Sequence, residues 1–282
     1  MRTSPSALAL AVHAALQLAG GGAAATHAAA EPAWAPGLTA VYKLKMAGMD
    51  IGTFNFNATI KGDDYALAGH GKLGWGFGLY SYNGSFSSAG KIEREEARPS
   101  SYAYDWKVNR KAGSVRMGFS GTAVRSVEIV PPHERSADVV PVLPDQLKAV
   151  FDPLSALLAL SRHRTGDPCD RKIAVFEGKQ RFDLVLAAHR LEKIVEAKPS
   201  GQPVVVHVCR VKYVPVSGHR PNRETLAMVK AEGIEVALRQ VPSASLLVPI
   251  RITIPTPLGT AVLSAQRVDI TAPGNNKIAL VH

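Results

Sequence analysis

Two cysteines carry the most readable chemistry in this chain of 282 residues. Cys169 and Cys209 stand 40 residues apart and could pair as a disulfide, supply a reactive thiol or bind a metal. His207 lies two positions before Cys209, so in a strand both side chains would face the same side. Two ligands do not complete a zinc site, which usually takes three or four. We therefore favour a Cys169–Cys209 disulfide over a metal site.

The first 30 residues have the features of a secretory signal peptide, which would explain an oxidised cysteine pair. Arg2 is followed by an apolar run at residues 7–18 and then by small residues. The run is shorter than the roughly 20 residues of a membrane-spanning helix. Cleavage fits either residues 23–25 or residues 28–30, and we favour a mature start near residue 31. We expect residues 31–282 to be exported, not membrane-spanning, and placed where disulfides form.

Local signatures of catalysis are absent from the sequence. There is no Walker loop, no dinucleotide-binding glycine fingerprint, no His-Glu-x-x-His and no Gly-x-Ser-x-Gly. Histidines and acidic pairs such as Asp63-Asp64 lack motif spacing, and we interpret them as surface or packing residues. We expect a protein without enzymatic activity and without a cofactor. Because catalytic triads assemble from distant positions, a hydrolase of the cell envelope is the alternative of a different class.

The elements that position these residues are predicted to be mostly strands. Tyr42, Leu44 and Met46 alternate with lysines, and residues 54–60 repeat this period of two, which indicates one buried face. Further strands are predicted at residues 101–108, 114–118, 123–130, 173–176, 181–188, 204–214, 226–231, 234–240, 248–254 and 261–270. Turns are predicted at residues 47–48, 61–64, 83–84, 177–178, 200–201 and 231–233.

So many strands in one chain must hide their edges. We predict a mainly β fold: a single-domain curled antiparallel sheet, as a β-spiral or half-open, barrel-like structure, of about a dozen or more strands with one short helix. No linker divides residues 31–282, and chains of this length often form one β domain.

The helix is predicted at "FDPLSALLALSRHR", residues 151–164. Asp152 is a natural N-cap, and Pro153 suits the first helical position. Leucines follow, and basic residues at 162–164 suit the negative end of the helix dipole. The helix would either cover an apolar opening of the curled sheet or lie outside it as a crossover.

A glycine-rich tract, "GKLGWGFGLYSYNGS" at residues 71–85, is the most unusual local sequence. Glycines at 74, 76 and 78 alternate with large residues, so an extended strand would have one bare and one bulky face. It is either a coiled strand at a sheet corner or a wall facing a ligand. The possible ligand-facing apolar residues are Trp75, Phe77, Leu79, Tyr80 and Tyr82.

Positive charge is concentrated in one window. The net charge is +10, and residues 161–223 hold 13 lysines and arginines against 6 acidic residues. An exported protein rarely meets nucleic acid, so the charge serves either solubility or an envelope lipid or acidic glycan. The cations that would contact a phosphate or carboxylate head group are Arg162, Arg164, Arg171 and Lys172.

Several segments resemble a known family. Tyr42 with Gly48 and Gly52, then "DPLSALL", "PCDRKIAVFEGKQRFDL" and "CRVKYVPVSGH", occur in the order typical of the bacterial exported family called domain of unknown function 3108. The resemblance covers residues 38–270 and implies a periplasmic, β-rich protein of Gram-negative bacteria without an assigned activity. It supplies no catalytic residues.

These observations lead to one main hypothesis and two alternatives. The main hypothesis is a non-enzymatic periplasmic protein that supports cell-envelope integrity and binds an envelope lipid, glycan or protein in the concave face of its sheet. A narrower alternative is a periplasmic carrier of lipids or lipoproteins, which needs an enclosed, dry pocket that holds an acyl chain. The other alternative is the envelope hydrolase, which needs convergent titratable groups.

Overall fold

The computed structural model describes residues 35–282 except 77–78, 133–136, 163–165 and 198–200. The predicted signal peptide, Phe77 and Arg164 lie outside these residues. The strands are β1 (Gly37–Met46), β2 (Met49–Lys61), β3 (Asp64–Trp75), β4 (Tyr80–Glu93), β5 (Glu96–Val108), β6 (Lys111–Ser120), β7 (Ala123–Val130), β8 (Arg171–Phe176), β9 (Arg181–Val195), β10 (Pro203–Ser217), β11 (Glu235–Val241), β12 (Leu246–Thr256), β13 (Gly259–Thr271) and β14 (Lys277–Val281). The helices are α1 (Pro153–Ser161) and α2 (Arg223–Lys230), with short 3-10 turns at Pro144–Leu147, Pro242–Ala244 and Pro273–Asn275.

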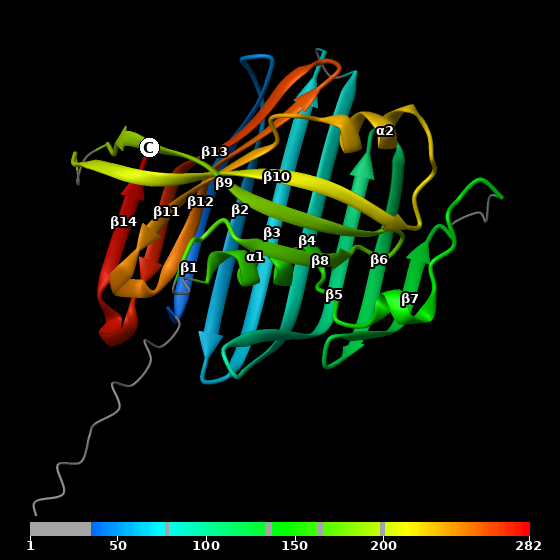
Figure 1. The fold of residues 1–282 in the computed structure, drawn as a ribbon, viewed down its shortest axis with the longest axis horizontal. Coiled ribbons are helices and arrows are strands. Elements are labelled where there is room, and N and C mark those ends of the chain that lie inside the picture. Colours follow the sequence, from blue (N-terminus) through cyan, green and yellow to red (C-terminus); the bar gives the residue numbers. More distant parts are fainter. Residues whose placement is uncertain (1–34, 77–78, 133–136, 163–165, 198–200) are drawn as a thin grey trace, which may run out of the picture. The chain divides into compact units, whose positions relative to one another are not determined.

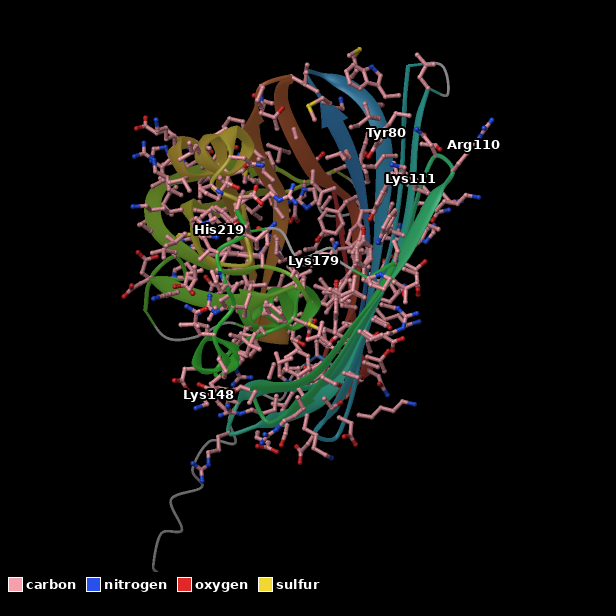
Figure 2. The ribbon with its side chains drawn as sticks, turned by 90° about the vertical axis from the view of Figure 1, so that its right-hand side faces the viewer. Tyr80, Arg110, Lys111, Lys148, Lys179 and His219 are labelled. Atoms are coloured by element: carbon pink, nitrogen blue, oxygen red, sulfur yellow. A yellow bond between two sulfur atoms is a disulfide. The ribbon has the colours of Figure 1, made fainter. Side chains whose placement is uncertain are left out.

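All fourteen strands belong to one antiparallel sheet, as predicted. Strands β1 to β7 form a meander, and β8 to β13 form a second run that meets the first where β1 pairs with β13. On its other edge β13 pairs with β12 and then with β14. The sheet curls so that β9 and β10 run across the direction of β2–β5, and the two runs face each other across an interior filled with side chains (Figures 1 and 2).

The period of two predicted for the strands is confirmed in their burial. In β2, Phe56 and Ile60 are buried while Asn57 and Thr59 are exposed. The core gathers the inward side chains of both runs, from Phe56 on β2 to Val206 on β10. Burial of these apolar faces is what holds the curl together.

Helix α1 lies inside the curl and not outside it. It contacts β3, β4 and β5 of the first run and β8 and β12 of the second. Its buried residues include Leu154 and Leu158, both part of the main core. Of the two predicted placements, covering the interior of the sheet is therefore confirmed, although the helix ends at Ser161 with Arg162 as its C-cap.

The N-terminus of α1 is fixed by a buried carboxylate. Asp152 is fully buried, and its Oδ1 accepts the backbone N–H groups of Leu154 and Ser155 at 3.0 Å each. Its Oδ2 accepts the hydroxyls of Ser155 at 2.5 Å and Ser88 at 3.0 Å. Tyr65 extends the network to Ser155 at 2.8 Å. Two strands of the meander thus hold the start of the helix.

Val150 and Phe151, just before α1, connect the ends of the two runs of strands through backbone hydrogen bonds. The Val150 N–H donates to the carbonyl of Thr122, in the β6–β7 turn, at 3.1 Å. The Phe151 N–H donates to Ala174 of β8 at 2.9 Å, and Phe176 donates back to Phe151 at 2.9 Å. Backbone hydrogen bonds thereby bridge the two ends of the strand order, near β7 and at β8.

The predicted disulfide is confirmed. Cys169, just before β8, is bonded to Cys209 on β10, and both are buried. Leu186, Leu238 and Leu247 share their apolar cluster. Since Cys209 is in the disulfide, the rival metal site with His207 is wrong.

Three local predictions are wrong. The strand predicted at 226–231 is helix α2, which begins after Asn222 because that side chain accepts the N–H of Thr225 at 3.0 Å. The turn predicted at 83–84 lies inside β4, where Tyr82 covers Gly84. The tract at 71–85 is not one extended strand: β3 ends at Trp75, β4 begins at Tyr80, and the chain reverses between them.

Asp152→Ala should lower the free energy of unfolding by about 3 kcal/mol, because it removes a helix cap and leaves buried hydroxyls without an acceptor. Asp152→Asn should cost less, since asparagine caps helices equally well.

Burial raises the pKa of Asp152, so ionisation disfavours the folded state. Urea unfolding across pH should therefore show wild type losing stability relative to Asp152→Asn as pH rises. Equal losses of unfolding free energy in Asp152→Ala and Asp152→Asn would contradict the capping role.

Replacing both cysteines by alanine should lower the free energy of unfolding by up to about 4 kcal/mol, the loop-closure value for a bridge of this separation. Reduction of wild type before urea unfolding should produce the same loss. The double variant should not respond to the reductant. Coinciding urea midpoints of the oxidised wild type and the double variant would contradict a stabilising role.

Candidate functional site

An apolar groove of about 300 Å³ lies on the concave face. Strands β12, β13 and β1 to β4 are consecutive in the sheet and wrap around it. Its lining residues are Leu44, Thr53, Phe54, Gly71, Leu73, Tyr82, Phe86, Ile252, Ile254, Ala261 and Leu263. The hydroxyls of Thr53 and Tyr82 are the polar side-chain groups in this lining. This volume is at the lower end of small-molecule sites, so the groove suits a narrow apolar ligand.

Two of the lining residues, Phe54 and Phe86, belong to a chain of aromatic contacts that extends to Tyr42 on β1 and Tyr104 on β5. Tyr42 and Phe54 have ring centroids 6.4 Å apart, Phe54 and Phe86 meet edge to face at 6.1 Å, and Phe86 stacks on Tyr104 at 4.5 Å. Tyr82 and Tyr104 join their hydroxyls at 3.0 Å. Rings that contact one another across strands make a continuous and rigid apolar surface.

Glycines allow these rings to lie flat on the sheet. A Cβ at Gly69 would come within 2.9 Å of the Phe54 ring, and one at Gly84 would collide with the Tyr82 hydroxyl. Larger residues at these positions would therefore push the rings off the sheet and into the groove. Gly69 and Gly84 therefore leave room for the Phe54 and Tyr82 rings, and of these two only Gly84 belongs to the glycine-rich tract at residues 71–85.

A small polar group reaches the same interior from the β8–β9 turn. Glu177 accepts the backbone N–H of Gln180 at 2.8 Å, and Gln180 accepts the hydroxyl of Tyr213 at 3.1 Å. Gly178 lies against Val115 of β6, so the turn spans the interior. Burial raises the pKa of Glu177, and burial, with a smaller contribution from Glu177, raises the pKa of Tyr104 and Tyr213.

Of the predicted apolar residues, one lines the groove and three lie outside its lining. Tyr82 lines it, while Trp75 is 48%, Leu79 84% and Tyr80 42% exposed beyond it. Phe77 lies outside the described residues. Sequence reasoning missed Phe54, Phe86 and Tyr104 as site residues, because their contacts across strands depend on register. The alternation at residues 54–60 was the available signal.

The predicted cations do not join this groove. Arg162, Arg171 and Lys172 line a separate polar pocket of about 540 Å³, and Arg164 is outside the described residues. Arg162 pairs with Glu95 at 2.8 Å, and Lys172 pairs with Asp183 at 3.0 Å. Arg171 donates to the carbonyls at the end of α1, to Ala159 and Leu160 at 3.0 and 3.1 Å and to Arg162 at 2.7 Å. The hydrogen bonds from Arg171 cap the C-terminal end of α1.

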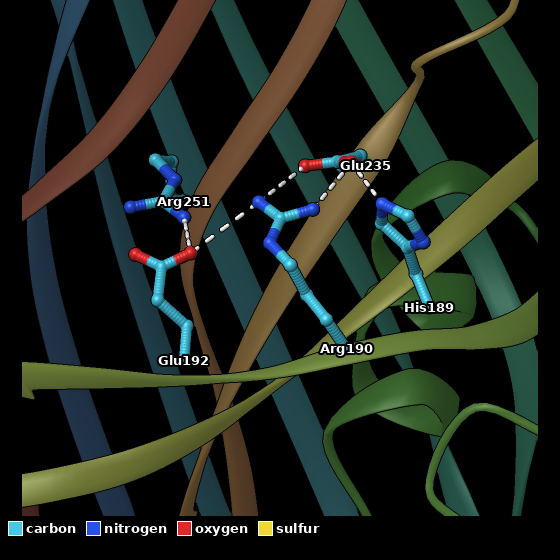
Figure 3. Close-up of polar contacts among 5 residues, drawn as sticks. All are labelled: His189, Arg190, Glu192, Glu235 and Arg251. Atoms are coloured by element: carbon cyan, nitrogen blue, oxygen red, sulfur yellow. Dashed lines mark hydrogen bonds and ion pairs between the residues drawn. The ribbon is translucent and has the colours of Figure 1, made fainter.

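Another group of charges forms an ion-pair ladder where β9 passes β11 and β12 (Figure 3). Arg190 holds Glu235 with two hydrogen bonds of 2.7 and 3.0 Å, and His189 lies 3.4 Å from the same carboxylate. Glu192 accepts from Arg251 at 2.7 Å. The hydrogen bonds from Arg190 and Arg251 lower the pKa of Glu235 and Glu192 respectively. The ladder joins strands and leaves both carboxylates ionised, which favours a structural role.

Two searches of the described residues bear on other kinds of site. No cluster of three or more histidine, cysteine, aspartate or glutamate side chains there could hold a metal ion. Among the helices that the structure describes, none combines the length and the apolar character needed to cross a membrane.

Comparison with known proteins gave one match. The family model described as "Protein of unknown function (DUF3108)" matches residues 41–266. Neither the curated proteins nor the solved structures gave a match.

Glu177→Gln should make the protein more stable relative to wild type as pH rises. The raised pKa of Glu177 means that the folded state binds this proton more tightly than the unfolded state, so wild type loses stability as pH rises through the raised value. Glutamine can still accept the N–H of Gln180. Urea unfolding across pH would measure the effect, with Glu93→Gln at the exposed end of β4 as the matched control. Parallel curves for wild type and Glu177→Gln would contradict the buried placement.

Proposed function

Because the chain belongs to the DUF3108 family, whose description names no activity, we propose its function from the groove: the protein binds an acyl chain of an envelope lipid or lipoprotein. The observation that carries this proposal is a groove that is lined by aliphatic and aromatic side chains from both runs of strands. A periplasmic carrier or sensor of such molecules in a Gram-negative envelope would use a groove of this kind.

The groove has the chemistry of a hydrocarbon site. An acyl chain needs no hydrogen-bonding partner, and the lining offers almost none. Each buried methylene contributes roughly 0.8 kcal/mol. About ten methylenes would give roughly 8 kcal/mol before the cost of ordering the chain, enough for micromolar binding at best.

The groove lining supports binding more than hydrolysis. Among the described lining residues there is no carboxylate, imidazole or amine that could transfer a proton to a bound ester or amide. Glu177 is paired with a backbone N–H in the β8–β9 turn. The proposed role is therefore non-enzymatic.

Export to the periplasm is part of the proposal. The Cys169–Cys209 bridge supports it, because disulfides persist in oxidising compartments. The apolar run at residues 7–18, after Arg2, supports it independently. In the periplasm the protein would meet lipids and lipoproteins that cross between membranes, and holding their acyl chains would support envelope integrity.

Ala261→Trp should weaken binding of a fluorescent fatty-acid probe at least about tenfold, because the indole fills the groove. An energetic cost of about 1.4 kcal/mol corresponds to that factor. Thr260→Trp is the matched control: it adds the same side chain at the neighbouring exposed position of β13. Native mass spectrometry of wild type from periplasm should show an adduct of lipid mass that Ala261→Trp lacks.

The same pair of variants tests the proposed role in cells. In a strain that lacks the gene and is sensitive to detergent, Thr260→Trp should restore resistance and Ala261→Trp should not. Equal probe affinity of the two variants, or an apo mass for wild type, would overturn the acyl-chain proposal.

A further inference from the structure

The two ends of the sheet differ in chemistry. Because neighbouring strands are antiparallel, the β1–β2, β3–β4, β5–β6 and β12–β13 turns lie at one end, here called the apolar rim. The β2–β3, β4–β5 and β6–β7 turns lie at the other end. Large exposed apolar side chains of the rim are Met49, Trp75, Leu79, Tyr80 and Leu258. Among described residues at the opposite turns, in 61–64, 91–98 and 120–123, none of the large hydrophobic side chains is exposed.

Charge follows the same division. Residues 43–53, 72–76, 79–83, 105–113 and 253–262, which form the described part of the rim, contain six lysines and arginines and two aspartates. The three opposite turns, at 61–64, 91–98 and 120–123, contain four lysines and arginines and five acidic residues. The apolar rim therefore combines exposed apolar side chains with a net positive charge. The opposite end is polar and close to neutral.

Hydrogen bonds join the apolar and the positive parts of the rim. Asn109, in the β5–β6 turn, accepts the backbone N–H of Ser81 at 2.8 Å and donates its own N–H to the Ser81 carbonyl at 2.8 Å. This contact places Arg110 and Lys111 beside Tyr80, and Figure 2 shows the three at the same end of the molecule. Exposed Trp and Tyr next to Lys and Arg is the composition of membrane-interface segments.

One end of the groove lies close to this rim. Leu44, Leu73, Tyr82 and Ala261 line the groove and stand a few residues from the β1–β2, β3–β4 and β12–β13 turns. An acyl chain leaving the groove along these strands would reach exposed apolar side chains before it reached water.

We infer that the apolar rim docks on an anionic phospholipid surface, so that the groove exchanges its ligand directly with the bilayer. The inference rests on the proposed function for the identity of the ligand. The location of the docking surface is inferred from separate observations. These are the exposed aromatic and aliphatic side chains of the rim and the excess of positive charge there. Basic residues held near an anionic leaflet are attracted to it, and the exposed apolar side chains add apolar burial in the head-group region.

Sedimentation with vesicles tests the inference on the full mature protein. Wild type should bind vesicles containing phosphatidylglycerol more tightly than vesicles of phosphatidylcholine alone, and high salt should weaken that binding. Arg110→Glu with Lys111→Glu should weaken binding at least about tenfold. Trp75→Ser with Leu79→Ser should do the same, and bromine-labelled lipid should quench wild-type tryptophan fluorescence more than that of Trp75→Phe.

Matched controls separate a specific rim from general charge. Lys61→Glu with Arg94→Glu makes the same charge change at the opposite end, and it should bind vesicles like wild type. Circular dichroism and thermal unfolding of each variant should match wild type. Rim variants that bind as wild type does, or a loss equal to that of the control pair, would overturn the inference. So would rim variants that only convert a dimer into a monomer.

The groove variant keeps the two proposals distinguishable. Leu263→Trp, which fills the groove at a lining position outside the rim, should lose the fatty-acid probe and still sediment with anionic vesicles. If wild type binds vesicles but no probe, the acyl-chain function fails while the docking surface stands. If wild type binds the probe but no anionic vesicles, the docking inference fails alone.

Discussion

The structure depends on how a wide antiparallel sheet is held in a curl without closing into a barrel. The buried carboxylate of Asp152 is the central constraint, since it starts α1 and ties that start to Ser88 on β4 and, through Ser155, to Tyr65 on β3. From there the helix packs against both runs of strands. Arg171 fixes the other end of the helix by donating to its last carbonyls. With both ends held, α1 occupies one part of the interior and leaves the rest open.

This occupation explains why the concave face contains both a core and a groove. Leu154 and Leu158 fill the part of the interior near α1. Beyond the reach of the helix, the rings of Phe54 and Phe86 lie against their own sheet and the space above them stays free. The groove is therefore a product of where the helix stops. The ion-pair ladder joins β9 to β11 and β12 within the second run of strands.

Much of this fold could be predicted from the sequence, because its signals are local. Alternation identified the strand regions from Tyr42 to Ile60, Asp152-Pro153 identified the helix start, and an exported chain with two cysteines identified the disulfide. β3 and β4 were not predicted as strands. Their glycines and small residues are typical of turns, and the rings that cover those glycines come from positions that only the register brings together. Helix α2 was mistaken for a strand because short apolar segments fit either period. The partners of Arg162 and Arg171 depend on tertiary contacts and had no signal in the sequence.

The long-range pairing of β1 with β13 has a consequence for how the chain is made. Strands β1 to β7 are joined by short turns and can associate as soon as they are synthesised, but the outer edge of β1 has to wait for residues 259–271. During that interval ten residues of unpaired backbone face the surroundings, and such an edge recruits other strands. The nascent protein therefore has a defined window of aggregation risk, which ends only when nearly the whole polypeptide has been completed.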